Sequence, residues 1–503
     1  MKKVLTPSQM READSAAFVA VGPSFELMRR AGAAVGWAAL RLLGGGYGRR
    51  VTVVCGKGNN AGDGMIAAAW LARRGAQCTI ALEDPRVFTG DALTAFEQLP
   101  HLRVVGFSSL ARELDRSDLA IDAIVGTGFR GTLEGETAAA VELLNHARGP
   151  IVSIDVPSGV NAETGAVETA AVRAAVTVTL AALKPGLLLH PGASFAGDIE
   201  VADIGIADEL MPTDLYVAEA SDVRAMLLAR PAVSNKRSVG KVLVVAGSPG
   251  MSGAAVLAAR GALRAGAGFV KLAVPNGLAA HVDRNVPEVL IAGLAETGTG
   301  AIESSAAGQV AELAAGFDSV ALGPGLGRDD ETAEFVRKVL LVIDKPLVLD
   351  ADGLAPFGGA ISEIAHRRQP TILTPHSGEL ARLVAATAEE IDAGRIHAAR
   401  EASRTSRAVV LLKGSPTVVA DPDGRTVLTD TGGPLLSTAG TGDVLTGIIA
   451  ALAAHLTAFD AAWVGAWIHG RAADLLAPSY GDRGMMAGDI VDAIPLAIAE
   501  ARL

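Results

Sequence analysis

Short apolar segments, each followed by a helical segment, alternate along most of this chain. In the first half, residues 51–55 run directly into a glycine-rich segment at residues 56–64, and a helix is predicted from there to about Gly75. In the second half, residues 241–246 open the same pattern again. Strands that alternate with helices are typical of βα units around a parallel sheet. The sequence therefore predicts an α/β fold in both halves.

Further strands are predicted where short apolar runs lie between turn residues. They lie at residues 77–82, 119–124, 151–155, 175–180, 268–274, 319–322, 347–350, 371–373 and 408–412. The last hundred residues are expected to be mostly helical. A chain of 503 residues is too long for one ordinary core. Because strand periodicity is lost at residues 206–214, we predict a division near residues 212–223, with domains at residues 1–215 and 222–503.

The composition limits the possible partners. Half of the residues are hydrophobic, only 4% are aromatic, and 58 are glycine. This mixture suits Val- and Ala-rich parallel strands packed closely against helices. A net charge of −11 argues against a nucleic-acid partner, which would need a basic face.

Cysteine use and hydropathy indicate the compartment. Cys55 and Cys78 offer no zinc-binding spacing and fit a reducing cytosol. Charged residues interrupt the N-terminal segment before any signal-like apolar core forms. The longest apolar stretch, residues 444–459, is short for a membrane span. We therefore expect a cytoplasmic protein with no membrane partner.

A turn of small residues, Ser-Thr-Ala-Gly-Thr-Gly-Asp at residues 437–443, precedes an apolar helical segment. The first N–H groups of a helix have no partners within it and suit a phosphate. Asp443 could then take a proton from a hydroxyl that faces this phosphate. The alternative is that Asp443 only stabilises the helix dipole.

In the first half, the segment at residues 56–64 lacks both the Gly-x-Gly-x-x-Gly fingerprint and the Gly-Lys-Ser/Thr of a P-loop. It instead carries the oxygen-bearing side chains of Asn59, Asn60 and Asp63 within one turn. A simple dinucleotide-binding or NTP-hydrolysing domain is therefore not indicated.

Asp122, Asp155 and Ser158 follow other predicted strands of the first half. If these strands are neighbours, their polar residues meet at one edge of the sheet. Such an oxygen set suits a weakly hydrated monovalent cation better than zinc, and Asp155 could transfer a proton. The alternative is that Asp155 and Ser158 only satisfy turn backbone.

In the second half, five segments at strand ends carry glycine or polar residues. They are residues 246–253, 322–327, 349–353, 374–379 and 413–417. Together with Asp443 they predict a phosphotransferase-like pocket, in which Lys413 and backbone amides contact phosphates. Taken alone, His376 could be an ordinary strand-end histidine and Lys413 a solvated lysine, and flexible backbone is expected after Lys413.

These motifs together make the chain similar to the bifunctional NAD(P)H-hydrate repair enzymes, which join an NAD(P)HX epimerase domain to an ADP- or ATP-dependent (S)-NAD(P)HX dehydratase domain. The second half resembles the dehydratase in the five segments above and in residues 440–443. The first half resembles the epimerase in residues 58–64, Asp122, 126–128, 155–159, 184–186 and 202–206. The likeness covers nearly the whole chain. It implies a Rossmann-like three-layer sandwich followed by a ribokinase-like α/β domain.

The resemblance implies that the first domain interconverts the R and S hydrates, NADHX and NADPHX, that form when water adds across a nicotinamide double bond. Asn60, Asp122 and Ser158 would hold K⁺, and Asp155 would be catalytic and contact the substrate. The other substrate-binding residues would be Asn59, Asn60, Ala61, Gly62, Asp63, Gly126, Thr127, Gly128, Phe129, Arg130, Gly131 and Thr132.

For the second domain, the resemblance implies that ADP or ATP, with Mg²⁺, phosphorylates the hydroxyl of the S hydrate. Expulsion of phosphate would then restore NAD(P)H and leave AMP or ADP, with Asp443 as the catalytic base. The nucleotide would bind Lys413, Gly414, Ser415, Pro416, Thr417 and Gly442. The hydrate would contact Ala255, Gly325, His376 and Asp443. We also expect a homo-oligomer, with a tetramer favoured.

Two departures from the family pattern stand out. Ala61 lies where the family often has glycine, which costs little unless the position needs a positive φ. Residues 234–238 differ from the family's usual His-Lys-Gly, so the resemblance assigns no phosphate contact to Lys236.

Two other functions fit parts of the sequence. A ribokinase-type small-molecule kinase would use the same Gly-Thr-Gly-Asp turn but would leave the polar cluster of the first half without a use. Alternatively, the first half is a non-catalytic binding module for an enzymatic second half.

Overall fold

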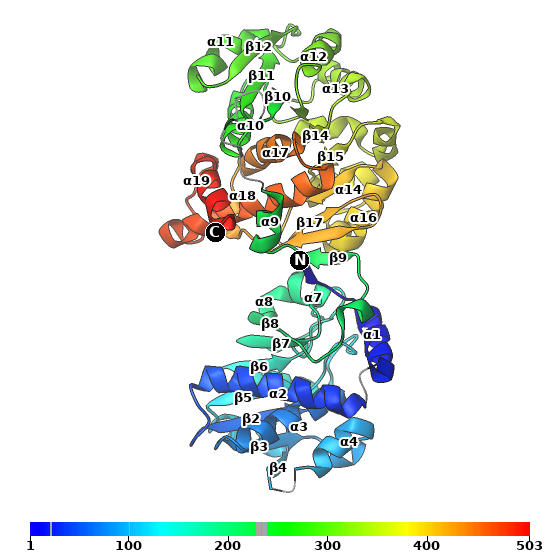
Figure 1. Ribbon diagram of the computed structural model, residues 1–503, viewed down its shortest axis with the longest axis vertical. Coiled ribbons are helices and arrows are strands. Elements are labelled where there is room, and N and C mark those ends of the chain that lie inside the picture. Colours follow the sequence, from blue (N-terminus) through cyan, green and yellow to red (C-terminus); the bar gives the residue numbers. More distant parts are fainter. Residues whose placement is uncertain (21–22, 100, 228–232, 234–238) are drawn as a thin grey trace. The chain divides into compact units, whose positions relative to one another are not determined.

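The computed structural model describes residues 1–20, 23–99, 101–227, 233 and 239–503. The chain forms two compact units, Lys2–Thr213 and Asp214–Leu503 (Figure 1). Lys236, for which the sequence assigns no role, lies outside the described residues.

The first unit contains a parallel sheet in the order β4-β3-β2-β5-β6-β7-β8. Its strands are β2 (Arg50–Cys55), β3 (Gln77–Leu82), β4 (Arg103–Gly106), β5 (Leu119–Ala123), β6 (Ile151–Ile154), β7 (Val176–Leu180) and β8 (Asp198–Ala202). The central strands are buried on both faces, which explains why they are continuous apolar runs rather than alternating ones.

Helices cover both faces of this sheet. Val53 packs with one group of helices, and the next residue, Val54, packs with the other, as expected for successive side chains of a strand. The first group is α1 (Pro7–Ala20), α2 (Ser24–Leu43), α3 (Asn59–Ala72) and α4 (Gly90–Glu97), and the second is α5 (Leu110–Leu114) and α6 (Gly135–Asn145). Two short helices, α7 (Pro185–Leu188) and α8 (Ala193–Ala196), follow β7. The unit is therefore a three-layer sandwich, as predicted.

The second unit is built on a sheet in the order β9-β18-β17-β16-β15-β14-β13-β10-β11-β12. Neighbours are parallel except for the two pairs that involve β17. The strands are β9 (Leu215–Val217), β10 (Lys241–Val245), β11 (Phe269–Pro275), β12 (Leu290–Leu294), β13 (Ser319–Leu322), β14 (Leu347–Leu349), β15 (Thr371–Leu373), β16 (Val409–Leu412), β17 (Thr417–Ala420) and β18 (Thr426–Thr429).

One face of this sheet is covered by a tightly packed group of helices, and Figure 1 shows a second group on the other side. The first group is α10 (Ser252–Arg264), α17 (Thr441–Ala453), α18 (Ala458–Tyr480) and α19 (Ala487–Ala501), and the second includes α12 (Ala307–Ala314), α13 (Asp330–Val342), α14 (Ser377–Val384) and α16 (Arg395–Ser406). Helices α10 and α17 approach closely through glycine: a Cβ atom at Gly447 would lie 2.0 Å from the carbonyl oxygen of Ala258.

The predicted α/β architecture is confirmed in both halves, but several short strands were not predicted. Two of them, β4 and β8, are partly exposed edge strands, and the others include β9, β12, β17 and β18. The expectation of flexible backbone after Lys413 was wrong at Thr417, which begins β17. The helix after β2 also begins earlier than the glycine-rich segment suggests, at Asn59.

Each sheet reverses its strand order once, between β2 and β5 in the first unit and between β10 and β13 in the second. Ligands of open α/β sheets bind at the carboxyl ends of the strands at such a reversal. In both sheets a glycine follows the strand there: Gly56 donates its N–H to the Ala123 oxygen (3.0 Å), and Gly247 donates to the Pro324 oxygen (2.9 Å).

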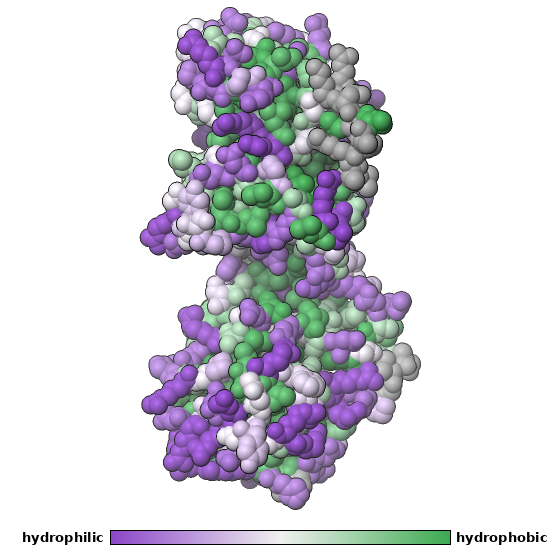
Figure 2. All heavy atoms as spheres, turned by 60° about the vertical axis from the view of Figure 1, so that its left-hand side comes forward, coloured by the Kyte–Doolittle hydropathy of each residue, from purple (hydrophilic) through white to green (hydrophobic). Residues whose placement is uncertain are grey.

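Hydrophilic residues occupy much of the face seen in Figure 2, with smaller hydrophobic areas between them. Within the described part of the chain, each helix is either too short or too polar to cross a membrane.

Two candidate active sites

A cavity of about 790 Å³ opens at the strand reversal of the first unit. Most of the residues predicted to bind the hydrate line it, together with Asp14 and Lys184. The predicted residues on its wall are Asn59, Asn60, Asp63, Gly126, Thr127, Gly128, Phe129, Arg130, Thr132 and Asp155. Three others, Ala61, Gly62 and Gly131, do not line it. The first turn of α3 and the segment after β5 thus form two of its walls.

Behind this wall, Asp122 and Ser158 form a fully buried pair. The Ser158 hydroxyl donates to Asp122 Oδ1 at 2.6 Å, and the Ser158 amide donates to Oδ2 at 2.9 Å. Burial raises the pKa of Asp122, although these hydrogen bonds oppose the shift. Asn60 Nδ2 donates to the Val125 oxygen at 3.0 Å, and that oxygen also accepts from the Ser158 hydroxyl at 3.2 Å.

The three predicted cation ligands therefore belong to one connected group, and all of their side-chain acceptor atoms are oxygens. No group of three or more His, Cys, Asp or Glu side chains that could hold a metal ion occurs among the described residues.

Asp155 occupies a left-handed backbone conformation, with φ of 66°. Residues other than glycine rarely adopt this conformation, and Asp is among the few that tolerate it. Its carboxylate forms an ion pair with Lys184, whose side chain is only 1% exposed. Asp63 lies in the same cavity and is buried; burial, followed by the charges of Asp155 and Asp14, raises its pKa well above the ordinary value.

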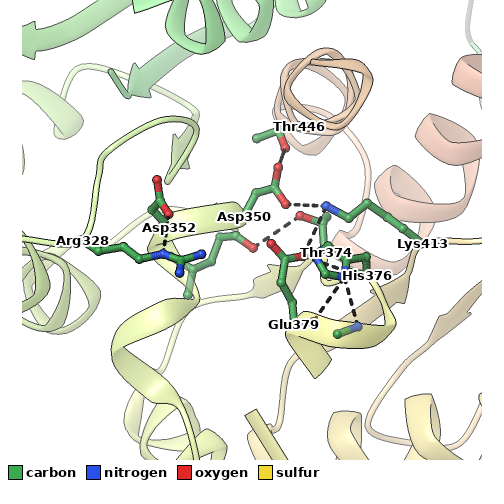
Figure 3. A network of polar contacts seen from close by, with 10 residues as sticks. Arg328, Asp350, Asp352, Thr374, His376, Glu379, Lys413 and Thr446 are labelled. Carbon is green, nitrogen blue, oxygen red and sulfur yellow. Dashed lines mark hydrogen bonds and ion pairs between the residues drawn. The ribbon is translucent and has the colours of Figure 1, made fainter. Parts of the chain in front are cut away.

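In the second unit, polar side chains from the ends of β14, β15 and β16 meet below the N-terminus of α17 (Figure 3). Lys413 Nζ donates to Asp350 Oδ1 at 3.0 Å and lies 3.6 Å from a carboxylate oxygen of Glu379. The Thr446 hydroxyl donates to Asp350 Oδ2 at 2.6 Å. Burial acts to lower the pKa of Lys413, but the charges of Asp350, Glu379 and Asp443 outweigh it and raise this pKa.

Asp443 is the third residue of α17, and Gly440 caps that helix with φ of 91°. Gly442 approaches Lys413 so closely that a Cβ atom there would lie 3.5 Å from Nζ. Burial, followed by the charge of Asp350, raises the pKa of Asp443 to about 7, and Lys413 opposes this shift. A carboxyl group with such a pKa can exchange protons near neutral pH.

Arg395 forms hydrogen bonds with the segment after β16. This segment includes predicted nucleotide-binding residues. This guanidinium donates to the carbonyl oxygens of Lys413 (3.0 Å) and Pro416 (3.4 Å). Gly414 has φ of 152°, and a Cβ atom there would lie 2.2 Å from the guanidinium. Only glycine fits at this position. The remaining members of the predicted set, Ser415 and Thr417, lie within or directly after this segment.

The predicted hydrate-binding residues of the second unit differ in exposure. His376 caps α14: its side chain is 56% exposed, and Nδ1 accepts from the amides of Gly378 (3.0 Å) and Glu379 (3.3 Å). Gly325 has φ of 60°. Ala255 is fully buried in α10.

The sequence alone assigns no functional role to several residues that the structure places at the two sites. In the sequence, Lys184 is recognisable only as part of a segment that resembles the epimerase, and Asp350 only as an acid at the end of a predicted strand. Thr446 and His469 could not be recognised as site residues from the sequence, because polar residues within apolar helical segments resemble core positions. Burial lowers the pKa of His469 to about 4, although a hydrogen bond with the Thr441 backbone opposes the shift.

Known proteins resemble this chain in both halves. The sequence profile described as YjeF-related protein N-terminus matches residues 24–186, and that of NAD(P)H-hydrate dehydratase matches residues 242–496. A bifunctional NAD(P)H-hydrate repair enzyme of Moorella thermoacetica is 42% identical over 94% of this chain and 92% of its own. One from Thermofilum pendens is 36% identical over 99% and 97%, respectively.

Among solved structures, the ADP/ATP-dependent NAD(P)H-hydrate dehydratase of Bacillus subtilis, co-crystallised with ATP and Mg²⁺, is 30% identical to this chain. The match covers 58% of this chain and 100% of that protein, with a TM-score of 0.50.

Proposed function

Since the chain belongs to the family of bifunctional NAD(P)H-hydrate repair enzymes, we propose that its first unit carries the epimerase and its second unit the dehydratase. The enzyme interconverts R and S NAD(P)HX and dehydrates the S form to NAD(P)H at the expense of ADP or ATP. Together the two reactions convert both hydrates to NAD(P)H, because epimerisation turns the R form into the S form that the dehydratase accepts.

One observation carries the assignment of the second unit: an acid with a pKa of about 7, Asp443, lies on the first turn of α17 near Lys413. The helix N-terminus and Lys413 suit the phosphates of the nucleotide. Asp443 would take the hydroxyl proton of the S hydrate as its oxygen receives the phosphoryl group. Loss of phosphate and of a proton from the adjacent carbon would then restore the double bond.

Around Asp443, we assign the nucleotide to Lys413, Gly414, Ser415, Pro416, Thr417 and Gly442, and the hydrate to Ala255, Gly325 and His376. Mg²⁺ bound with the nucleotide would neutralise phosphate charge. Such an ion usually takes one or two carboxylates and keeps several waters.

In the first unit, we assign the hydrate to the cavity formed by residues 59–63 and 126–132, and proton transfer to Asp155. K⁺ would be held by Asn60, Asp122 and Ser158. The carboxylate, hydroxyl and amide oxygens of these side chains are ligands that suit a hard cation with a loose hydration shell.

The test is to incubate the enzyme with ADP and purified hydrate. Repair yields AMP, free phosphate and the return of reduced-nicotinamide absorbance. A ribokinase-type kinase would instead retain the phosphate on its product, and that result would overturn the proposal.

The role of the first unit is tested separately with an R/S mixture. The wild-type enzyme should consume both forms, whereas Asp155→Asn in the full chain should leave the R form behind. Complete conversion by this variant would favour a non-catalytic first unit. A cytoplasmic location and a homotetrameric assembly stay predictions of the sequence.

A further inference from the structure

The ammonium group of Lys184 is buried next to Asp155, and all of its hydrogen-bonding capacity is used. It forms an ion pair with Asp155 Oδ1 and donates to the Thr179 hydroxyl at 3.1 Å and to the Leu180 carbonyl oxygen at 2.8 Å. A lysine ammonium has three donors and no acceptor. Lys184 therefore has no N–H left for a phosphate, a substrate or a proton relay, although it lines the cavity.

The two oxygens of the Asp155 carboxylate are not equivalent. Oδ1 accepts from Lys184 and from the Leu180 amide at 3.3 Å, whereas Oδ2 accepts only from the Thr127 amide at 3.3 Å among the contacts of the described residues. Each carboxylate oxygen can accept about two hydrogen bonds. Oδ1 is therefore saturated, whereas Oδ2 keeps one acceptor position, and Asp155 lines the cavity.

The backbone of Asp155 agrees with a side chain held in one fixed direction. A left-handed conformation at a residue other than glycine costs of order 1–3 kcal/mol and persists only where the surroundings fix it. Here Lys184, Leu180 and Thr127 supply that fixation from β7, its following segment and the segment after β5.

We propose that Lys184 is a positioning residue for epimerisation, which holds Oδ1 of Asp155 and leaves Oδ2 as the oxygen that exchanges a proton with the hydrate. This inference rests on the proposed role of Asp155 in the first unit. In each catalytic cycle, Oδ2 takes one proton from the substrate or from water and returns one, so that hydrate and enzyme end with unchanged composition.

The surrounding charges explain why Asp155 needs a dedicated cation. Asp14 and Asp63 line the same cavity, and burial together with the charge of Asp155 raises the pKa of both. An unpaired carboxylate in such a site would be strongly disfavoured, because burial removes its hydration. Without Lys184, Oδ1 of Asp155 would lose its ion pair and one of the contacts that fix its direction.

The test compares Lys184→Met, which keeps the length of the side chain but removes its charge, with Lys184→Arg, which keeps the charge. Epimerisation of purified R hydrate is followed in the full-length enzyme. Dehydration of purified S hydrate by the same samples reports the concentration of active protein. Lys3→Met is the matched control, because Lys3 belongs to the same unit and pairs with Asp208 but does not line the cavity.

We expect Lys184→Met to lower kcat for epimerisation by about 100-fold and to change KM by less than about threefold. This result is expected when a substitution weakens stabilisation of the transition state rather than binding of the substrate. Lys184→Arg should recover part of kcat. Lys3→Met should keep kcat, and dehydration should be unaffected in all three variants.

The inference is overturned if Lys184→Met keeps kcat within about threefold of wild type, or if Lys184→Arg is no better than Lys184→Met. The second result would mean that packing rather than charge matters, since methionine preserves packing better than arginine at a buried site. A wild-type enzyme that does not epimerise, or an Asp155→Asn variant with full activity, would instead overturn the proposed function of the first unit.

Discussion

The raised pKa of Asp443 makes a prediction about stability as well as activity: Asp443→Asn should make the second unit more stable at pH 8 but not at pH 5. The unfolded chain releases the proton of Asp443 near its ordinary pKa of 3.8, whereas the folded protein retains it until about pH 7. Between these values the unfolded state binds fewer protons than the folded state. Stability therefore falls as the pH rises through this window, and the loss is complete above pH 7.

The difference between a pKa of about 7 and 3.8 corresponds to roughly 4 kcal/mol for a fully buried group, at about 1.36 kcal/mol per pH unit. Asp443 is only partly buried, so solvent screening reduces this figure. Asparagine also loses the favourable interaction of a carboxylate with the N-terminus of α17, which is about 0.3–1 kcal/mol. We therefore expect a net gain of about 1–3 kcal/mol at pH 8.

The assay is urea-induced unfolding at both pH values, with hydrogen exchange of peptides from α17 to report on the second unit. Asp489→Asn is a matched control, because Asp489 is also the third residue of its helix and also follows a glycine, and its carboxylate accepts from the Met486 amide at 2.8 Å. This control should show no gain at pH 8. Equal stability of wild type and Asp443→Asn at both pH values would refute the reasoning, because it would mean that the carboxylate is ionised in the fold without cost.

Other perturbations test the two sites and the packing between helices. Asp155→Asn should lower epimerisation by about 100-fold and leave dehydration of pure S hydrate unchanged; equal loss of both reactions would indicate misfolding. At nucleotide concentrations well below KM, kcat/KM for dehydration should rise about tenfold between pH 6 and pH 8 as Asp443 ionises. Lys413→Met should move this rise to higher pH, because Lys413 lowers the pKa of Asp443. Gly447→Ala should destabilise the second unit by about 1–3 kcal/mol through overpacking against α10, measured by thermal unfolding, whereas Gly308→Ala in α12, where a Cβ atom meets open space, should not.

Much of the fold could be predicted because the central strands are buried on both faces and therefore appear in the sequence as continuous apolar runs. The bounds predicted for β3, β13 and β15 agree with the structure. The edge strands β4 and β8 escaped prediction, since exposed positions need no apolar pattern and their pairing is decided by neighbours far away in sequence.

For the sites, the sequence indicated which residues lie at the ends of strands but not which of them pair. Lys184 and Asp155 are 29 residues apart, and Lys413 and Asp350 are 63 apart. Neither spacing is a local pattern, because strand order in the sheet decides these contacts. The raised pKa of Asp443 depends on such long-range neighbours, so the sequence suggested a base at this position without its protonation behaviour.

The lysines of the two sites differ in which carboxylate they contact, and in the second site that carboxylate is Asp350. In the first unit, Lys184 pairs directly with Asp155. In the second, Lys413 pairs with Asp350 at 3.0 Å, and burial, followed by the charge of Asp350, raises the pKa of Asp443 to about 7.

Asp350→Asn should therefore lower the pKa of Asp443 by two routes, since it removes a like charge and releases Lys413 to interact with Asp443. The rise of dehydration kcat/KM with pH should move to lower pH in this variant. The stability gain of Asp443→Asn at pH 8 should also shrink when both substitutions are combined, a coupling that a double-mutant cycle measures directly. Thr446 can still donate to the asparagine oxygen, so the fold around position 350 is expected to persist. Purely additive effects would mean that Asp350 does not control the protonation of Asp443, and the raised pKa would then have to come from burial alone.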